Sequence, residues 1–237
     1  MRERPILFNA DMVGAVLDGK KTQTRRIIQS PAKNMQASGH KVIEYREPGD
    51  KWYGEHVFSM RNKSGTWCDY TKEQFMAKCP FGAVGDRLWV RETWMPDAPR
   101  DGSWGDVEFY GCKGSPLSMI PKRYRKPEHC IHRASWDGHE MVGWTPSIHM
   151  PRWASRITLE ITGVRVERLW DITEDDAKAE GCTFEALRFK PGTREVEEMG
   201  HTAVYQFGGL WQSIYGADSW QANPWVWVVE FKRVEVE

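Results

Sequence analysis

The stretch that most constrains the fold is residues 9–26, where a short amphipathic helix is followed directly by a run of polar residues. Asn9 suits an N-cap, and apolar residues between Met12 and Leu17 lie along one side, which predicts a helix that packs inward. Gly19 stands where a left-handed residue ends a helix, and residues 20–26 are all polar. Because the glycine fixes where the chain leaves the helix, we expect an irregular loop that presents these side chains as a site.

Length and charge limit what kind of protein this is. With 237 residues the chain is long enough for one large or two small domains with a substantial core. Its 33 basic and 33 acidic residues balance, so nucleic-acid contacts would have to come from local basic patches, such as residues 20–26 and 122–133. Thirteen tryptophans indicate a compact fold with aromatic packing or stacking surfaces.

Compartment and metal content are also indicated by the sequence. Five irregularly spaced cysteines and a start without an apolar signal segment predict a cytoplasmic protein with free thiols. No apolar run approaches the roughly 18 residues of a membrane span, so we expect no membrane partner. The histidines and cysteine at 129–132 lack a second ligand pair at zinc spacing, so we expect no metal there.

The remaining patterns predict a fold of class α+β, mostly β. Strands are expected at 5–8, 85–94, 156–162 and 225–231, hairpin strands within 30–78, and helices at 173–181 and 207–216. Two prolines in 146–153 indicate an ordered crossing loop. The apolar pattern changes parity at Gly163, which predicts a bend that lets a sheet curl. A small mixed barrel with short flanking helices and a long insertion at about 30–150 fits this order.

The chemistry of the polar run depends on its conformation. Lys21 and Thr24 face opposite ways in a regular strand but converge in a loop. A partly desolvated lysine can activate a threonine hydroxyl, and acyl transfer would also need a carboxylate. A solvated basic edge without specific chemistry is the alternative that spacing alone leaves open.

This polar run resembles a known family signature. Gly19, Lys21, Thr24 and Arg26 resemble the G-x-K-x-x-E-x-R pattern of the ASCH family, a branch of the PUA-like barrels, with threonine in place of the usual glutamate. That departure resembles the G-[RK]-K-T-x-T-x-R motif of the family's small bacterial N4-acetylcytidine amidohydrolases. A later L-T-E-x-x-A-x-x-E segment of those enzymes resembles residues 172–180 here and puts Glu180 at the position of their glutamate.

The resemblance covers about residues 1–30, 83–94 and 153–237. Residues 228–232 resemble the V-I-E-F-K ending of the amidohydrolases, while residues 4–9 and 146–153 resemble phage and prophage ASCH proteins. The resemblance therefore implies a single PUA-like (ASCH) domain over 1–237, a mixed β-barrel whose Trp-rich insertion at about 30–150 lies outside the likeness. A phage protein of this kind would act in the bacterial host cytoplasm.

The resemblance also implies roles for particular residues. Thr24 would be the nucleophile, Lys21 its activator and Glu180 the acid/base for the leaving amine, and no cofactor is needed. The implied substrate is an N-acylated cytosine-type base or nucleoside. The candidate ligand-binding residues are Arg26, Glu92, His149, Arg152 and Trp153. For Glu92 an exposed strand end, and for Trp153 a place in the core, are the plain structural alternatives.

Three functions remain open at this point. The main expectation is a module that binds a nucleoside, a modified base or single-stranded nucleic acid, with hydrolysis of an N-acyl group as an added activity. Lys21 and Arg26 would then contact phosphate while tryptophans stack on bases. An amidohydrolase of the N4-acetylcytidine type as the main role is the first alternative. The second is a phage-encoded interaction protein that acts on a host factor.

Overall fold

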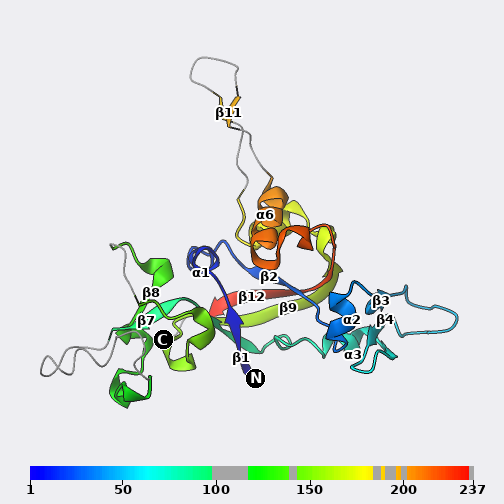
Figure 1. Ribbon diagram of the computed structural model, residues 1–237, viewed down its shortest axis with the longest axis horizontal. Coiled ribbons are helices and arrows are strands. Elements are labelled where there is room, and N and C mark those ends of the chain that lie inside the picture. Colours follow the sequence, from blue (N-terminus) through cyan, green and yellow to red (C-terminus); the bar gives the residue numbers. More distant parts are fainter. Residues whose placement is uncertain (98–116, 139–142, 184–187, 190–195, 199–201, 235–237) are drawn as a thin grey trace, which may run out of the picture. The chain divides into compact units, whose positions relative to one another are not determined.

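The computed structural model describes residues 1–97, 117–138, 143–183, 188–189, 196–198 and 202–234. They form a mixed α+β fold dominated by sheets (Figure 1), which confirms the predicted class. Contacts within the chain define two compact units. The first holds Met1–Lys21, Gly85–Ile161 and Phe231–Glu237, and the second holds Thr22–Val84 and Thr162–Glu230. The predicted insertion is thus divided, since residues 30–84 belong to the second unit and residues 85–150 to the first.

The largest sheet has the strand order β1-β6-β9-β12-β2. Its strands are β1 (Glu3–Leu7), β6 (Arg87–Arg91), β9 (Thr158–Arg168), β12 (Trp225–Val234) and β2 (Gln23–Ile27). β1 runs parallel to β6, β6 runs antiparallel to β9, and β12 runs antiparallel to β2. Over the described residues β1 and β2 are edge strands and no closed barrel forms.

The first unit contains the opening helix. α1 (Ala10–Leu17) begins at Asn9, whose side chain accepts a hydrogen bond from the Met12 amide at 2.8 Å. Met12, Val13 and Val16 are buried, and Gly19 follows with a φ of 72°. The sequence predicts three features of this helix: an N-cap, a buried row of apolar side chains and a glycine with positive φ after its end. The structure confirms all three.

A small antiparallel pair, β7 (Trp94–Pro96) with β8 (Cys130–His132), also lies in this unit. Trp94, Met150 and Ala154 are fully buried and form a core cluster with the partly buried Trp153 against it. The predicted crossing loop is therefore ordered by packing. The short 3₁₀ turns of this region are η1 (Leu117–Met119), η2 (Lys122–Tyr124), η3 (Pro127–His129), η4 (Arg133–Ser135), η5 (Ser147–His149) and η6 (Arg152–Ala154).

The second unit contains the predicted hairpins. β3 (Ile43–Tyr45), β4 (Phe58–Arg61) and β5 (Trp67–Tyr70) form an antiparallel sheet beside α2 (Lys33–Ala37) and α3 (Lys72–Met76). The rings of Phe58 and Phe75 stack with their centroids 4.4 Å apart, and Phe75 stacks on Trp227 at 5.5 Å. This aromatic stack joins the small sheet and α3 to β12.

Two helices of the second unit begin and end near the predicted residues. α5 (Glu174–Ala179) is capped by Thr173 and followed by Gly181 at a φ of 92°. α6 (Ala203–Tyr215) ends at Gly216 and lies along β2 and β12 (Figure 1). The other elements are η7 (Leu169–Asp171), β10 (Arg188–Phe189), β11 (Val196–Glu198) and η8 (Ala217–Ser219).

The spacing of Phe207, Leu210, Trp211 and Ile214 predicts the buried face of α6, and the observed face is rotated from it. Phe207 and Trp211 pack against Val226 and Val228 of β12, as the apolar spacing predicts, but Ile214 is 41% exposed. Ala203 is buried instead and extends the stripe toward the start of the helix. The helix thus packs on the sheet through Ala203, Phe207 and Trp211. Residues four apart lie on the same side of a helix.

Candidate functional site

The second half of the motif that resembles the ASCH signature, from Gln23 to Arg26, lies on a β-strand. The sequence predicts an irregular loop over 20–26, and this prediction is wrong from Gln23 onward, because β2 pairs with β12 from Gln23 opposite Glu230 to Ile27 opposite Val226. The pairing satisfies backbone N–H and C=O groups of a largely buried segment. Strand alternation then separates the side chains, with Gln23 and Arg25 on one face and Thr24 and Arg26 on the other.

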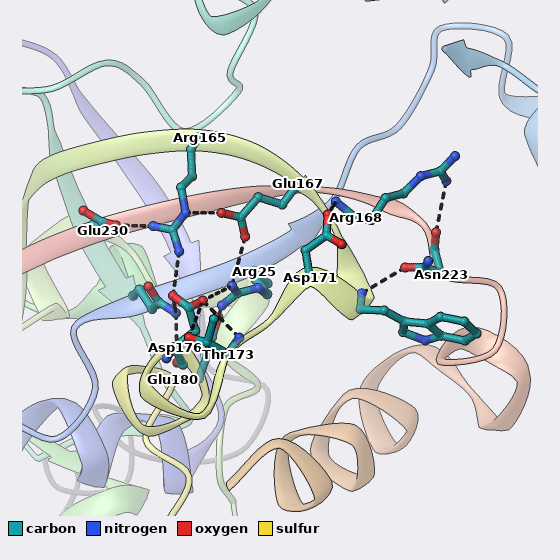
Figure 2. Close-up of polar contacts among 12 residues, drawn as sticks. Arg25, Arg165, Glu167, Arg168, Asp171, Thr173, Asp176, Glu180, Asn223 and Glu230 are labelled. Atoms are coloured by element: carbon teal, nitrogen blue, oxygen red, sulfur yellow. Dashed lines mark hydrogen bonds and ion pairs between the residues drawn. The ribbon is translucent and has the colours of Figure 1, made fainter. Parts of the chain in front are cut away.

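On the first face Arg25 is the centre of an ion-pair network (Figure 2). Its fully buried guanidinium lies 3.1 Å from Glu167, 3.2 Å from Asp176 and 3.5 Å from Glu180. Arg165 of β9 joins the same group, since its Nη2 lies 2.6 Å from Asp176 and its other nitrogens contact Glu167 and Glu230. Two guanidinium groups therefore hold four carboxylates from β9, β12 and the α5 region.

Asp176 receives most of the hydrogen bonds in this network. The Gln23 side-chain amide donates to its backbone oxygen at 2.8 Å and to Oδ1 at 3.1 Å, and the Thr173 amide and hydroxyl donate to Oδ2. Burial acts to raise the pKa of Asp176, but the Thr173 hydrogen bond, the Arg25 charge and the Gln23 hydrogen bond outweigh it and lower the pKa to about 2. Asp176 is thus a charged anchor between α5 and β2.

A backbone contact completes the attachment of the motif to α5. The Thr22 amide donates to the Ala179 oxygen at 2.8 Å, next to Glu180 at the C-cap of the helix. Main-chain and side-chain contacts together fix β2 against α5 over residues 22–25. This attachment holds the start of β2, so the opposite face of the strand is presented in a defined position.

The three predicted catalytic residues are all buried. Lys21, in the first unit, is 2% exposed, and its amine lies 5.6 Å from the Phe8 ring centroid. Thr24 and Glu180, in the second unit, are 1% and 3% exposed. By alternation the Thr24 side chain lies on the face of β2 away from Arg25, while the Glu180 carboxylate contacts Arg25. Their joint role in catalysis stays a prediction.

The predicted ligand residues of the first unit lie in different settings. Glu92 is 1% exposed, and Arg156 donates to both of its carboxylate oxygens at 2.9 and 3.0 Å. Arg152 is exposed and pairs with Glu3 at 3.0 Å, His149 is exposed, and the Trp153 ring meets Trp94 edge to face at 5.5 Å. Glu92 is therefore not an exposed strand end, and its contact with a ligand stays a prediction.

A cavity of about 580 Å³ lies at the end of β2 that Arg26 and Ile27 form, entirely within the second unit. Three cationic side chains line it, Arg26, Lys33 and Lys78, and among the described residues around it there is no aspartate or glutamate. Its aromatic lining comes from Phe81, Tyr215 and Trp227, and Ile27, Ile28, Gln29, Ser30, Pro31, Met60 and Pro80 complete the wall. Its volume lies in the range of small-molecule sites, about 300 to 1,000 Å³.

The strand register explains how this cavity forms. Arg26 lies directly opposite Trp227 in the β2–β12 ladder, so the two side chains share one face. Past the strand, Ser30 and Ile28 are held by Gln36 of α2, whose side chain accepts from the Ser30 amide at 2.8 Å and donates to the Ile28 oxygen at 2.9 Å. The wall of the cavity is therefore an ordered backbone rather than a loose loop.

The basic side chains differ in how they are held. The Lys78 amine lies 4.3 Å from the Tyr70 ring centroid, a cation–π contact at the edge of the cavity. Lys33 is exposed, and no ion pair involves it in the described part of the chain. Sequence reasoning assigned a binding role to Arg26 and missed Lys33, Lys78 and Tyr215. The three residues share only that each is basic or aromatic and lies at or near a helix terminus. This pattern is too common in sequences to identify binding residues.

Comparison of the chain with protein-family models, with curated proteins and with solved structures finds no match. Among the described helices none is both long and apolar enough to cross a membrane. The described residues also contain no group of three or more histidine, cysteine or acidic side chains placed to hold a metal ion. Conclusions about function therefore rest on the geometry of the sites themselves.

Proposed function

We propose that this protein binds a nucleotide, either free or as one unit of a single-stranded nucleic acid, in the cavity beside Arg26. The observation that carries the proposal is the lining of that cavity, which combines three cations and three aromatic rings without a carboxylate among its described residues. Cations match a phosphate, and aromatic faces match a base, each stacked base contributing roughly 1 to 3 kcal/mol.

This proposal agrees with the resemblance of the motif to the ASCH signature, which implies a PUA-like barrel that holds a base. In that interpretation Arg26 contacts phosphate and Trp227 or Tyr215 stacks on the base. The ion-pair network on the opposite face of β2 then serves to position the strand that carries Arg26.

Binding can be tested by fluorescence anisotropy of dye-labelled single-stranded RNA and DNA of 12 nucleotides and by calorimetry with CMP and AMP at low salt. We expect the exchange Lys33→Glu, at an exposed position, to weaken binding at least tenfold, with a similar loss for Lys78→Glu. Lys178→Ala is the matched control, because Lys178 is an exposed lysine of α5 outside the cavity. The proposal is contradicted if Lys33→Glu and Lys78→Glu bind as tightly as the unaltered protein. It is also contradicted if the unaltered protein does not bind at low salt.

The amidohydrolase activity implied by the resemblance is a second candidate. The observation that favours it is the burial of Lys21, because a lysine is almost never fully buried unless it is paired or has a specific role. The test measures acetate release from N4-acetylcytidine. Lys21→Met, Thr24→Val and Glu180→Gln should each abolish release while circular dichroism shows an unchanged fold. No release by the unaltered protein at high enzyme concentration ends this proposal without affecting the first.

A further inference from the structure

A second cavity of about 710 Å³ lies within the second unit, and its charge is opposite to that of the first. Four carboxylates line it, Glu55, Glu73, Glu167 and Asp171, and Lys72 is the one cation among the described lining residues. The remaining wall contains Tyr45, Phe58 and Trp225 together with smaller apolar and polar groups. The linings of the two cavities thus differ in the sign of their charge.

The aromatic side of this cavity is a corner of three inclined rings. The Tyr45 and Phe58 centroids lie 5.2 Å apart at 54°, and the Trp225 centroid lies 6.0 Å from each of them, at 53° and 80°. The rings pack on one another in tilted and edge-to-face contacts, and the electron-rich face of an aromatic ring attracts a cation. The Trp225 ring already receives one within the chain, since the Arg168 guanidinium lies 4.4 Å from its centroid.

The carboxylates of this cavity divide into two pairs. Glu167 is held by Arg25 and Arg165, and Asp171 accepts a hydrogen bond from the Arg168 amide at 3.1 Å. Glu55 and Glu73 take part in no ion pair within the described residues. Negative charge at the rim beside an aromatic corner is the arrangement with which proteins bind substituted ammonium groups.

We propose that this second cavity binds a small organic cation, a substituted ammonium ion, against the Tyr45 and Trp225 rings with Glu55 and Glu73 at the rim. The cavity volume is that of a small-molecule site and supports a small ligand. The proposal is independent of nucleotide binding in the first cavity. Trp225 and Trp227 lie two residues apart on β12 and line different cavities, so each site has its own reporter.

The test is an NMR titration of the full-length protein with tetramethylammonium chloride, observing ¹⁵N-labelled tryptophan indole signals. We expect the Trp225 signal, assigned with Trp225→Phe, to shift in a saturable manner while the Trp227 signal stays in place. Neopentyl alcohol, a neutral molecule of similar shape, should cause no comparable shift. Equal shifts with the alcohol would show an apolar hollow without cation selectivity and would overturn the proposal.

Variants give a second criterion. Tyr45→Leu, at a position that is 40% exposed, should raise the dissociation constant for tetramethylammonium at least fivefold, and the double change Glu55→Gln with Glu73→Gln should raise it severalfold. Glu44→Gln is the matched control, because Glu44 is a carboxylate of β3 that does not line the cavity. Unchanged affinity in the first two variants overturns the proposal. Binding of a tetralysine peptide without binding of tetramethylammonium also overturns it, in favour of a peptide ligand.

Discussion

The Arg25 guanidinium lies 3.5 Å from the Glu180 carboxylate, and the two side chains are 0% and 2% exposed. Charged groups this deeply buried lose their hydration, so Glu180 depends on Arg25 for compensation, while Arg25 is compensated by Glu180, Glu167 and Asp176. Glu180, to which the resemblance gives an acid/base role, is therefore a structural partner of β2.

Removal of the Arg25 charge should destabilise the protein strongly. Arg25→Met leaves Glu167, Asp176 and Glu180 without that cation, so we expect urea unfolding to show a loss of about 3 to 5 kcal/mol. Lys178→Ala, which breaks the exposed pair with Asp175, should change stability by less than about 1 kcal/mol. The double change Arg25→Met with Glu180→Gln should be less destabilised than the sum of the two single changes. Simple additivity would show that the two residues do not interact.

Acid should weaken the second unit through Asp176. Its pKa is about 2 in the folded protein against 3.8 for the ordinary side chain, so the folded state favours the carboxylate. The resulting stability, about 2 kcal/mol, is fully present above pH 4 and is lost as the pH falls from about 4 toward 2. Denaturant unfolding between pH 5 and 2 measures this slope. Asp176→Asn should be less stable at neutral pH and show a shallower slope, and an unchanged slope would contradict the assignment.

A second pH effect should arise from His132 in the first unit. Burial lowers the pKa of His132 from 6.5, although the Ala154 backbone oxygen, 3.0 Å from Nε2, and Glu92 act in the opposite direction. The folded state therefore favours the neutral ring. Its stability contribution is present above pH 6.5 and is lost as the pH falls, because the unfolded chain takes up a proton first.

Thermal unfolding of the unaltered protein and of His132→Gln between pH 7.5 and 5.5 tests the effect of this histidine. The unaltered protein should lose melting temperature toward pH 5.5 more steeply than the variant. The midpoint of the ¹H–¹³C histidine titration for His132 should lie below 6.5. A midpoint above 6.5 would show that the Glu92 charge dominates over burial.

The salt dependence of nucleotide binding tests the role of the basic cavity. If Lys33 neutralises a phosphate, the slope of log affinity against log salt for single-stranded RNA should become shallower by about 0.7 in Lys33→Ala. Lys41→Ala is a suitable comparison, because Lys41 is exposed and already pairs with Glu44 at 2.6 Å. If the slope for Lys33→Ala equals that of the unaltered protein, Lys33 does not contact the phosphate.

Local signals predicted much of the fold. The caps at Asn9 and Thr173 and the glycines at 19, 181 and 216 are short-range features, and the helices begin and end beside them. The loop predicted for residues 20–26 was wrong, since β2 owes its strand conformation to pairing with β12, which the local sequence does not reveal. A partner distant in sequence decides the conformation here, as strand propensity depends on context.

The site was predicted less completely than the fold. Arg26 was expected to contact a ligand, and it does line a cavity of suitable chemistry. Lys33 begins α2 and Lys78 lies in the turn after α3, and only tertiary packing brings the two to the same wall. Arg25 was not singled out, because its importance follows from the inward face of β2. Glu92 was considered only as a rim or exposed residue, because nothing in the sequence pairs it with Arg156.

The hydrogen bond from the Thr22 amide to the Ala179 oxygen uses main-chain atoms only. Side chains at these two positions can therefore change over evolutionary time while the start of β2 stays docked at the end of α5. Proline at position 22 is the exception, since it has no amide hydrogen to donate. Related sequences should accordingly vary at position 22 but exclude proline there.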